Sequence, residues 1–114
     1  MHRYLVVESH DPFEAELSAE FFDLALTLAQ AENDVAVLFV GDGVNAALAG
    51  RHSFWLAELR RAGVALYAEA SALAARGVSA AALSAGVRVT RGSEDLRAGR
   101  KPLWVADPAA RRAA

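Results

Sequence analysis

The amino-acid sequence predicts an α/β fold, a three-layer α/β/α sandwich built on a five-stranded, mostly parallel sheet. Short apolar runs, typical of strands that are buried on both faces, recur along the chain. Segments whose apolar residues follow helical spacing alternate with these runs, as in sheets that helices cover on both faces. A length of 114 residues with 54% hydrophobic positions suits one core, so we expect a single domain over residues 1–107 and a frayed tail over residues 108–114.

An apolar run and a capping pattern predict the first strand and the first helix. The run YLVVE, Tyr4–Glu8, is short and apolar enough to be a buried strand. Asp11 precedes Pro12 and stands three residues before Glu14, which combines an N-cap, a proline at the first helical position and a capping-box acid. The helix that begins there has one apolar stripe, formed by Leu17, Phe21, Leu24, Ala25 and Leu28.

A second strand and two helices are expected next. Asn33 and Asp34 end the first helix, and VAVLFV at residues 35–40 is a second buried strand. The G-D-G turn at residues 41–43 leads into a short helix that ends near Gly50. Ser53 is expected to cap the following helix, whose inward residues and terminating glycine are Trp55, Leu56, Leu59 and Gly63.

Shorter elements are predicted for the rest of the chain. VALYA at residues 64–68 is the third strand. Ser71 and Ser79 are expected to cap two short helical pieces that end at Gly77 and Gly86. The remaining elements are a strand VRVT at residues 87–90, a short helix opened by Ser93, Glu94 and Asp95 and closed by Gly99, and a fifth strand PLWVA at Pro102–Ala106.

Composition excludes several classes of function. A formal net charge of −2 gives no overall attraction for nucleic acid or for an anionic membrane. No window approaches the roughly 18 uninterrupted apolar residues of a membrane span, and the apolar run in MHRYLVVESH is too short for a signal peptide, so we expect a cytoplasmic protein. The absence of cysteine excludes disulfides, thiolate metal sites, iron–sulfur clusters and a sulfur nucleophile.

Charge is divided unevenly between the two halves of the chain. Residues 1–50 carry one base and nine acids, whereas residues 51–114 carry eleven bases and five acids, which gives −8 and +6. Two interpretations stay open: two solvated faces of one domain, or a self-complementary contact between subunits.

Several polar residues follow the predicted strands directly. Glu69 lies at the carboxyl end of the third strand, residues 8–11 lie at that of the first, and Asp42 follows the second. Because the carboxyl ends of parallel strands meet at one edge, where such folds place their ligands, we expect these residues to share a rim. A rival interpretation is a dinucleotide site, because residues 41–46 satisfy G-x-G-x-x-A, but the acid within the motif would repel a pyrophosphate.

The order of several short patterns indicates a family. A first strand and a long capped helix precede a D-G-V turn at residues 42–44, which is followed by A-G-V-A-L-Y at residues 62–67 and R-G-V at residues 76–78. In this order the chain resembles the DsrE-like family, which includes sulfur-relay subunits of the TusD type. The resemblance covers nearly the whole chain and is best over Gly63–Val78. It implies a three-layer fold and assembly into trimers or hexamers, sometimes with cysteine-free subunits beside active ones.

The sulfur-carrying members of that family bear a cysteine after the third strand. Laid on Gly63–Val78, this position falls on Glu69. Persulfide relay needs a polarizable thiolate that can attack and be attacked, and a carboxylate cannot replace it. The resemblance therefore implies a member that does not transfer sulfur.

Our hypothesis is a homo-oligomeric, cysteine-free DsrE-like subunit that binds a small ligand or a partner segment at the rim. We expect it to use no cofactor and no metal ion, and to bind neither nucleic acid nor a membrane. One alternative is an enzyme that uses Glu69 as a base or several rim carboxylates around a divalent metal. Another is a scaffold subunit that joins a paralogous, cysteine-bearing subunit in a hetero-oligomeric sulfur-relay complex. The candidate ligand-binding residues are Glu8, Ser9, His10, Asp11, Asp42, Asn45, Glu69 and Ser71.

Overall fold

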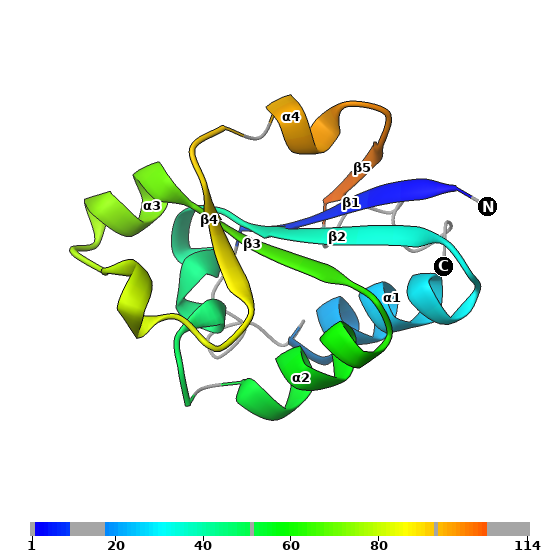
Figure 1. Cartoon of the computed structure of the whole chain (residues 1–114), viewed down its shortest axis with the longest axis horizontal. Helices are drawn as coiled ribbons and strands as arrows, with labels where there is room; N and C mark the ends of the chain where they lie inside the picture. The colour runs from blue at the N-terminus through cyan, green and yellow to red at the C-terminus, as the bar shows by residue number, and fades with distance from the viewer. Residues whose placement is uncertain (1, 10–17, 51, 93, 105–114) are drawn as a thin grey trace.

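The computed structural model describes residues 2–9, 18–50, 52–92 and 94–104 (Figure 1). Its strands form one five-stranded sheet in the order β4-β3-β2-β1-β5, and every neighbouring pair is parallel. The strands are β1 (Arg3–Glu8), β2 (Asp34–Phe39), β3 (Ala65–Glu69), β4 (Val87–Thr90) and β5 (Lys101–Trp104). The helices are α1 (Ser18–Gln30), α2 (Ser53–Arg61), α3 (Ala70–Ala75) and α4 (Glu94–Arg97), with 3-10 helices η1 (Gly41–Ala47) and η2 (Ala80–Ala82).

The strand order determines which connections cover each face of the sheet. From β1 to β4 each strand is added on the same side of its predecessor, whereas β5 returns to the other side of β1. Since crossovers between parallel strands are right-handed, the first connections and the last one must lie on opposite faces. Figure 1 shows α1 and α2 on one side of the sheet and α4 on the other. The predicted α/β fold with a five-stranded parallel sheet is confirmed.

Alternate residues of the strands build two apolar clusters of unequal size, because successive side chains of a strand point to opposite faces. The larger cluster, on the face of α1 and α2, contains Val6, Val37 and Leu66. The smaller one lies on the α4 face and consists of Leu5, Val7, Ala36 and Leu38, packed against Val40, Tyr67 and Leu96. The helical layer on that face is thin, since α4 is one turn long.

Most predicted elements are present. Strand boundaries differ by about one residue, whereas η1 and η2 end at Ala47 and Ala82, earlier than the predicted ends at Gly50 and Gly86. The strand VRVT is β4 as predicted, while β3 extends one residue further than expected and includes Glu69. Gly77, just after α3, has a positive φ angle, as expected for a residue that ends a helix. Gly86 also has a positive φ angle, but it lies in the turn before β4 and does not end η2. The capping pattern at Asp11, the end of the fifth strand at residues 105–106 and the tail at 108–114 lie outside the described residues.

Three predictions on helix α2 and its neighbour α3 are wrong in detail. Trp55 does not face inward: its residue is 45% exposed and its ring stacks on Phe22 at a centroid distance of 5.7 Å, while Leu56 and Leu59 are buried. Ser53 is the first residue of α2, and its Oγ accepts a hydrogen bond from the Gly50 N–H at 3.0 Å instead of capping the helix. Ser71 lies inside α3 and is therefore not its cap. Ser79, in contrast, is the N-cap residue of η2 as predicted, although its side chain makes no capping bond.

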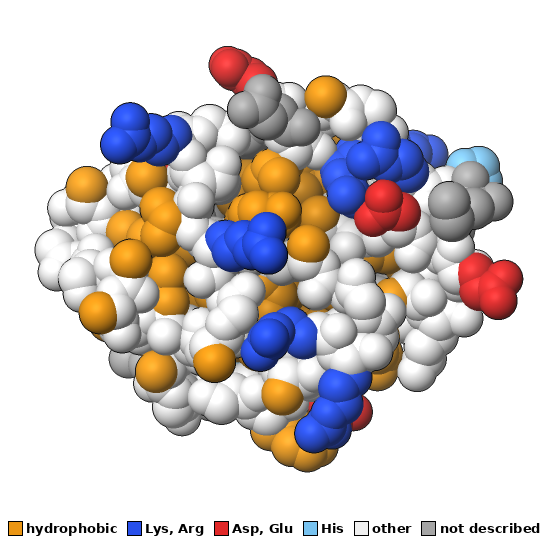
Figure 2. All heavy atoms as spheres, viewed as in Figure 1, with side chains coloured by type: hydrophobic (Ala, Val, Ile, Leu, Met, Phe, Trp, Pro, Cys, Tyr) orange, Lys and Arg blue, Asp and Glu red, His pale blue; other side chains and the backbone are white. Residues whose placement is uncertain are grey.

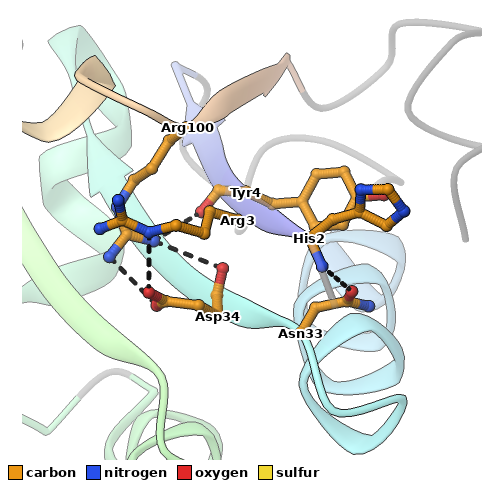
Figure 3. Close-up of polar contacts among 6 residues, drawn as sticks. All are labelled: His2, Arg3, Tyr4, Asn33, Asp34 and Arg100. Carbon is orange, nitrogen blue, oxygen red and sulfur yellow. Dashed lines mark hydrogen bonds and ion pairs between the residues drawn. The ribbon is translucent and has the colours of Figure 1, made fainter.

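A charged network holds the amino ends of β1 and β2 together (Figure 3). The Asp34 carboxylate binds the Arg3 Nε at 3.1 Å and the Arg100 guanidinium at 3.1 Å. Arg100 also donates to the main-chain oxygens of Tyr4 and Asp34, at 3.1 and 3.4 Å. Burial raises the pKa of the Asp34 carboxyl, but hydrogen bonds and charges from Arg3 and Arg100 outweigh burial and lower its pKa below 3.8. Nearby, the His2 N–H donates to the Asn33 side chain.

Helix lengths also bear on membrane insertion. Within the part of the chain that the structure describes, no helix is both long enough and apolar enough to cross a bilayer.

Candidate functional site

The carboxyl ends of β1, β2 and β3 meet at one end of the sheet because the three strands are parallel neighbours. We call the polar residues of this end the carboxyl-end rim. It consists of Glu8 and Ser9 at the end of β1, Asp42 and Asn45 in η1, and Glu69 and Ser71 around the start of α3. His10 and Asp11, the other two predicted site residues, lie outside the described residues.

A close backbone contact positions η1 against the end of β1. A Cβ on Gly43 would lie 2.0 Å from the carbonyl oxygen of Glu8, which no side chain tolerates. The same Glu8 oxygen accepts a hydrogen bond from the Val40 N–H at 3.0 Å. Gly43 is therefore needed for close approach, and it brings the polar residues of η1 to the ends of the strands.

Glu8 and Glu69 lie on opposite faces of the sheet. Glu8 is the last residue of β1, is 3% exposed, and alternation with Tyr4 and Val6 assigns its side chain to the α1 face. Glu69 is the last residue of β3 and is half-buried; alternation with Tyr67 assigns it to the α4 face. The rim therefore has two sides, and these two carboxylates do not converge on one point.

Glu69 also occupies the N-cap position of α3, which the sequence pattern had assigned to Ser71. Its backbone is extended, with φ −73° and ψ 126°, and it precedes the first residue of α3 as the N-cap. Its side chain makes no capping bond to that helix. In register it is paired with Thr90 of β4.

An ion pair that sequence reasoning missed joins η1 to α3. The Arg76 guanidinium contacts the Asp42 carboxylate at 2.6 Å and donates to the carbonyl oxygen of Ala72 at 3.0 Å. The two residues are 34 positions apart, so no local spacing could have paired them. Because the Asp42 side chain is 67% exposed, the pair orients two elements more than it stabilises the fold.

Three polar groups of the rim have no such partner. Within the described part of the chain, the Glu69 carboxylate, the Asn45 amide and the Ser71 hydroxyl make no hydrogen bond or ion pair with another residue. Asn45 and Glu69 are half-buried and Ser71 is exposed. The elements that carry them are in contact, since η1 packs against both β3 and α3. These groups can therefore bind a molecule that reaches the rim.

Two kinds of site find no support in this geometry. Among the described residues, no group of three or more histidine and carboxylate side chains could hold a metal ion. The G-x-G-x-x-A motif forms a 3-10 helix in which the open side of Gly43 is filled by the Glu8 backbone. A pyrophosphate needs that space, so the motif is not arranged as in dinucleotide-binding folds.

Comparisons with known proteins agree with this architecture. The crystal structure of the ychN protein from E. coli superposes with a TM-score of 0.80 at 22% identity, over 91% of this chain and 99% of that one. The protein of unknown function MTH1491 from Methanobacterium thermoautotrophicum superposes with a TM-score of 0.75 at 20% identity, over 91% and 99% of the two chains. At such identities the two structures show a common fold.

A search of functionally curated proteins finds no match. The sequence profile of the DsrE/DsrF-like family, in contrast, matches residues 2–96, which include β1 to β4 and the whole rim. The chain therefore belongs to the DsrE/DsrF-like family, as a member without cysteine.

Proposed function

We propose that this protein is a cysteine-free DsrE-like subunit that binds a small ligand or a partner segment at the carboxyl-end rim, without transferring sulfur. The observation that carries the proposal is Glu69, a half-buried carboxylate without a protein partner among the described residues, at the end of β3. The chain has no thiol anywhere, so it has no residue on which a persulfide can form.

The chemistry of the rim favours a ligand that donates hydrogen bonds. Glu69 offers only acceptor oxygens when ionised, and the Asn45 amide and Ser71 hydroxyl both accept and donate. Asp42 is already engaged by Arg76 and Glu8 is buried, so among the described rim residues the accessible negative charge left for a ligand comes from Glu69. A cationic amine or an amide group would satisfy these atoms, and half-burial would strengthen the contact relative to bulk water.

A titration followed by amide NMR tests this proposal with three probes: ethylamine, urea and glycerol. We expect ethylamine to shift the signals of Asn45, Glu69 and Ser71 more than the other two probes do. Glu69→Gln removes the charge while it keeps the shape, and should abolish the preference for the amine. Glu94→Gln, an exposed acid on α4, is the matched control. Equal responses in the two variants, or signals that move only outside the rim, would refute the proposed site.

We further propose that the subunit works as an oligomer. The second candidate function is a scaffold role, and the observation that favours it is an exposed aromatic pair on α2. Phe54 is 68% and Trp55 45% exposed, and their rings meet edge to face at 5.5 Å. Aromatic residues of this kind are enriched in protein interfaces. Native mass spectrometry of the purified chain distinguishes the candidates. A homotrimer or homohexamer fits the ligand-binding subunit, and stable recruitment of a cysteine-bearing paralogue fits the scaffold.

A further inference from the structure

A second polar surface lies at the opposite end of the sheet from the carboxyl-end rim. It is an open depression of about 400 Å³ between the turn that precedes β3 and the turn that precedes β4. We call it the amino-end depression. In Figure 2 basic side chains predominate over acidic ones on the face turned to the viewer, with hydrophobic side chains between them. The depression is lined by Arg60, Gly63, Val64, Ala65, Leu66, Gly86, Val87 and Arg88.

Arg60 is held in place by the backbone of the opposite turn. One of its terminal nitrogens donates to the Ala85 carbonyl oxygen at 3.2 Å. Its side chain also fills the space beside Gly86, where an added Cβ would lie 2.2 Å from the Arg60 Nε. A guanidinium has five N–H donors in a fixed plane, so this hydrogen bond leaves others for a ligand.

Arg88 supplies a second cation on the edge strand β4, where its side chain is exposed. Its register with Tyr67 assigns it to the α4 face, so it approaches the depression from the other side of the sheet edge than Arg60, which comes from α2. Across the described part of the chain neither Arg60 nor Arg88 forms an ion pair, whereas Arg61 and Arg76 do. The lining of the depression contains no acidic residue. Its two positive charges are therefore not neutralised by the protein itself.

The C-terminus of α2 also faces this region, and its carbonyl groups would repel an anion if they were free. They are engaged in the turn that ends the helix. The Ala62, Gly63 and Val64 N–H groups donate to the carbonyl oxygens of Glu58, Arg60 and Leu59, at 3.0 to 3.1 Å. The unfavourable dipole is thus reduced beside the Arg60 guanidinium.

We propose that the amino-end depression binds the phosphate group of a small phosphorylated molecule. Guanidinium groups match the oxygens of phosphate in charge and in planar geometry. The volume of about 400 Å³ lies within the range of roughly 300–1,000 Å³ that small-molecule sites have, so an organic group can occupy it beside the phosphate. This site is separate from the carboxyl-end rim and does not depend on Glu69.

Amide NMR titrations with inorganic phosphate and with glycerol phosphate test the proposal. We expect shifts centred on Gly63, Gly86 and Arg88, with glycerol phosphate binding more tightly than inorganic phosphate. Equal affinities for the two probes would overturn the assignment to a small phosphorylated molecule. Signals that move only at the rim would overturn the location.

Arginine variants test whether the two side chains make the site. Arg60→Gln and Arg88→Gln should each weaken glycerol phosphate binding about tenfold, because each removes a charge-assisted hydrogen bond. Arg91→Gln removes the same charge from an exposed position outside the depression and should leave the affinity within about twofold. If Arg91→Gln lost as much affinity for glycerol phosphate, the overall charge of the protein would explain the effect and the proposal would be overturned. Glu69→Gln should bind the phosphate as the wild type does, which separates this test from that of the rim.

Discussion

The two ends of the sheet use charged residues in opposite ways. At the amino ends of β1 and β2, the Asp34 carboxylate is bound by two arginines, and one of them also binds main-chain oxygens. At the carboxyl-end rim, Glu69 lies at the end of a strand with no partner among the described residues. A carboxylate paired with two guanidinium groups contributes to stability, whereas one without a protein partner is available to a ligand. Both residues are acids, so the network of contacts, more than residue type, separates the paired carboxylate from the one that is left available.

The largest expected effect comes from introducing a thiol at the rim. If Glu69 stands at the family's cysteine position, Glu69→Cys should take up sulfane sulfur from polysulfide and pass it to a small thiol, whereas the wild-type chain should not. Mass spectrometry measures the gain of one sulfur on the protein and its loss after the small thiol is added. Ala74→Cys, at an exposed position of α3, is the control, and Glu69→Cys should react about tenfold faster than it. Similar rates would show that the position of Glu69 is not special.

The next largest effect concerns the backbone contact that builds the rim. Gly43→Val should destabilise the fold by about 3 kcal/mol or more, because the new side chain would overlap the Glu8 carbonyl. Urea denaturation measures the loss. Gly92→Ala is the matched control, since nothing lies within 4 Å of its added Cβ, and the free energy of unfolding should change by less than about 1 kcal/mol. Equal losses in both variants would contradict the close packing of η1 on β1.

A smaller effect is expected at the other end of the sheet. Arg100→Ala should cost about 2 kcal/mol, because it removes hydrogen bonds to two main-chain oxygens and leaves Asp34 with one arginine. Arg97→Ala, at an exposed position of α4, should change the free energy of unfolding by no more than about 0.5 kcal/mol. If the two variants lost stability equally, the network of Figure 3 would make no specific contribution to the free energy of unfolding.

The smallest effect is the pH dependence of that network. The folded-state pKa of Asp34 lies below 3.8, its value in the unfolded chain, so its contribution is present above pH 3.8 and is lost as the pH falls through the folded pKa. Asp34→Asn should flatten this loss of stability in acid. The difference should stay below about 1 kcal/mol because the Asp34 side chain is 39% exposed. Thermal melts between neutral and acidic pH measure it, and identical curves for both proteins would refute the assignment.

Sequence patterns predicted the fold because each strand has a local signature. The strand VRVT and the burial of Leu56 and Leu59 could be predicted without knowledge of distant contacts. Trp55 could not be placed in the same way, because adjacent aromatic residues spread over much of the helix surface and spacing does not show which is covered. The cap of α3 was misplaced because the strand continues one residue further and takes Glu69 with it.

The candidate site was predicted only in part, for a reason of geometry. Parallel strands brought the rim residues to one end of the sheet, but strand alternation separates Glu8 from Glu69, and the pair Asp42–Arg76 spans 34 positions. The opposite charges of the two halves of the chain also meet within one molecule, where Arg76 contacts Asp42 and Arg100 contacts Asp34.

Because β5 pairs with β1, the sheet cannot be completed until the last described strand is available. Arg100 binds the Tyr4 carbonyl across 96 positions of sequence, and β1 gains its second neighbour only when β5 arrives. During translation, β1 therefore has one open edge until β5, the last described strand, leaves the ribosome. Such long-range closure slows folding and leaves an unprotected hydrogen-bonding edge in the nascent chain.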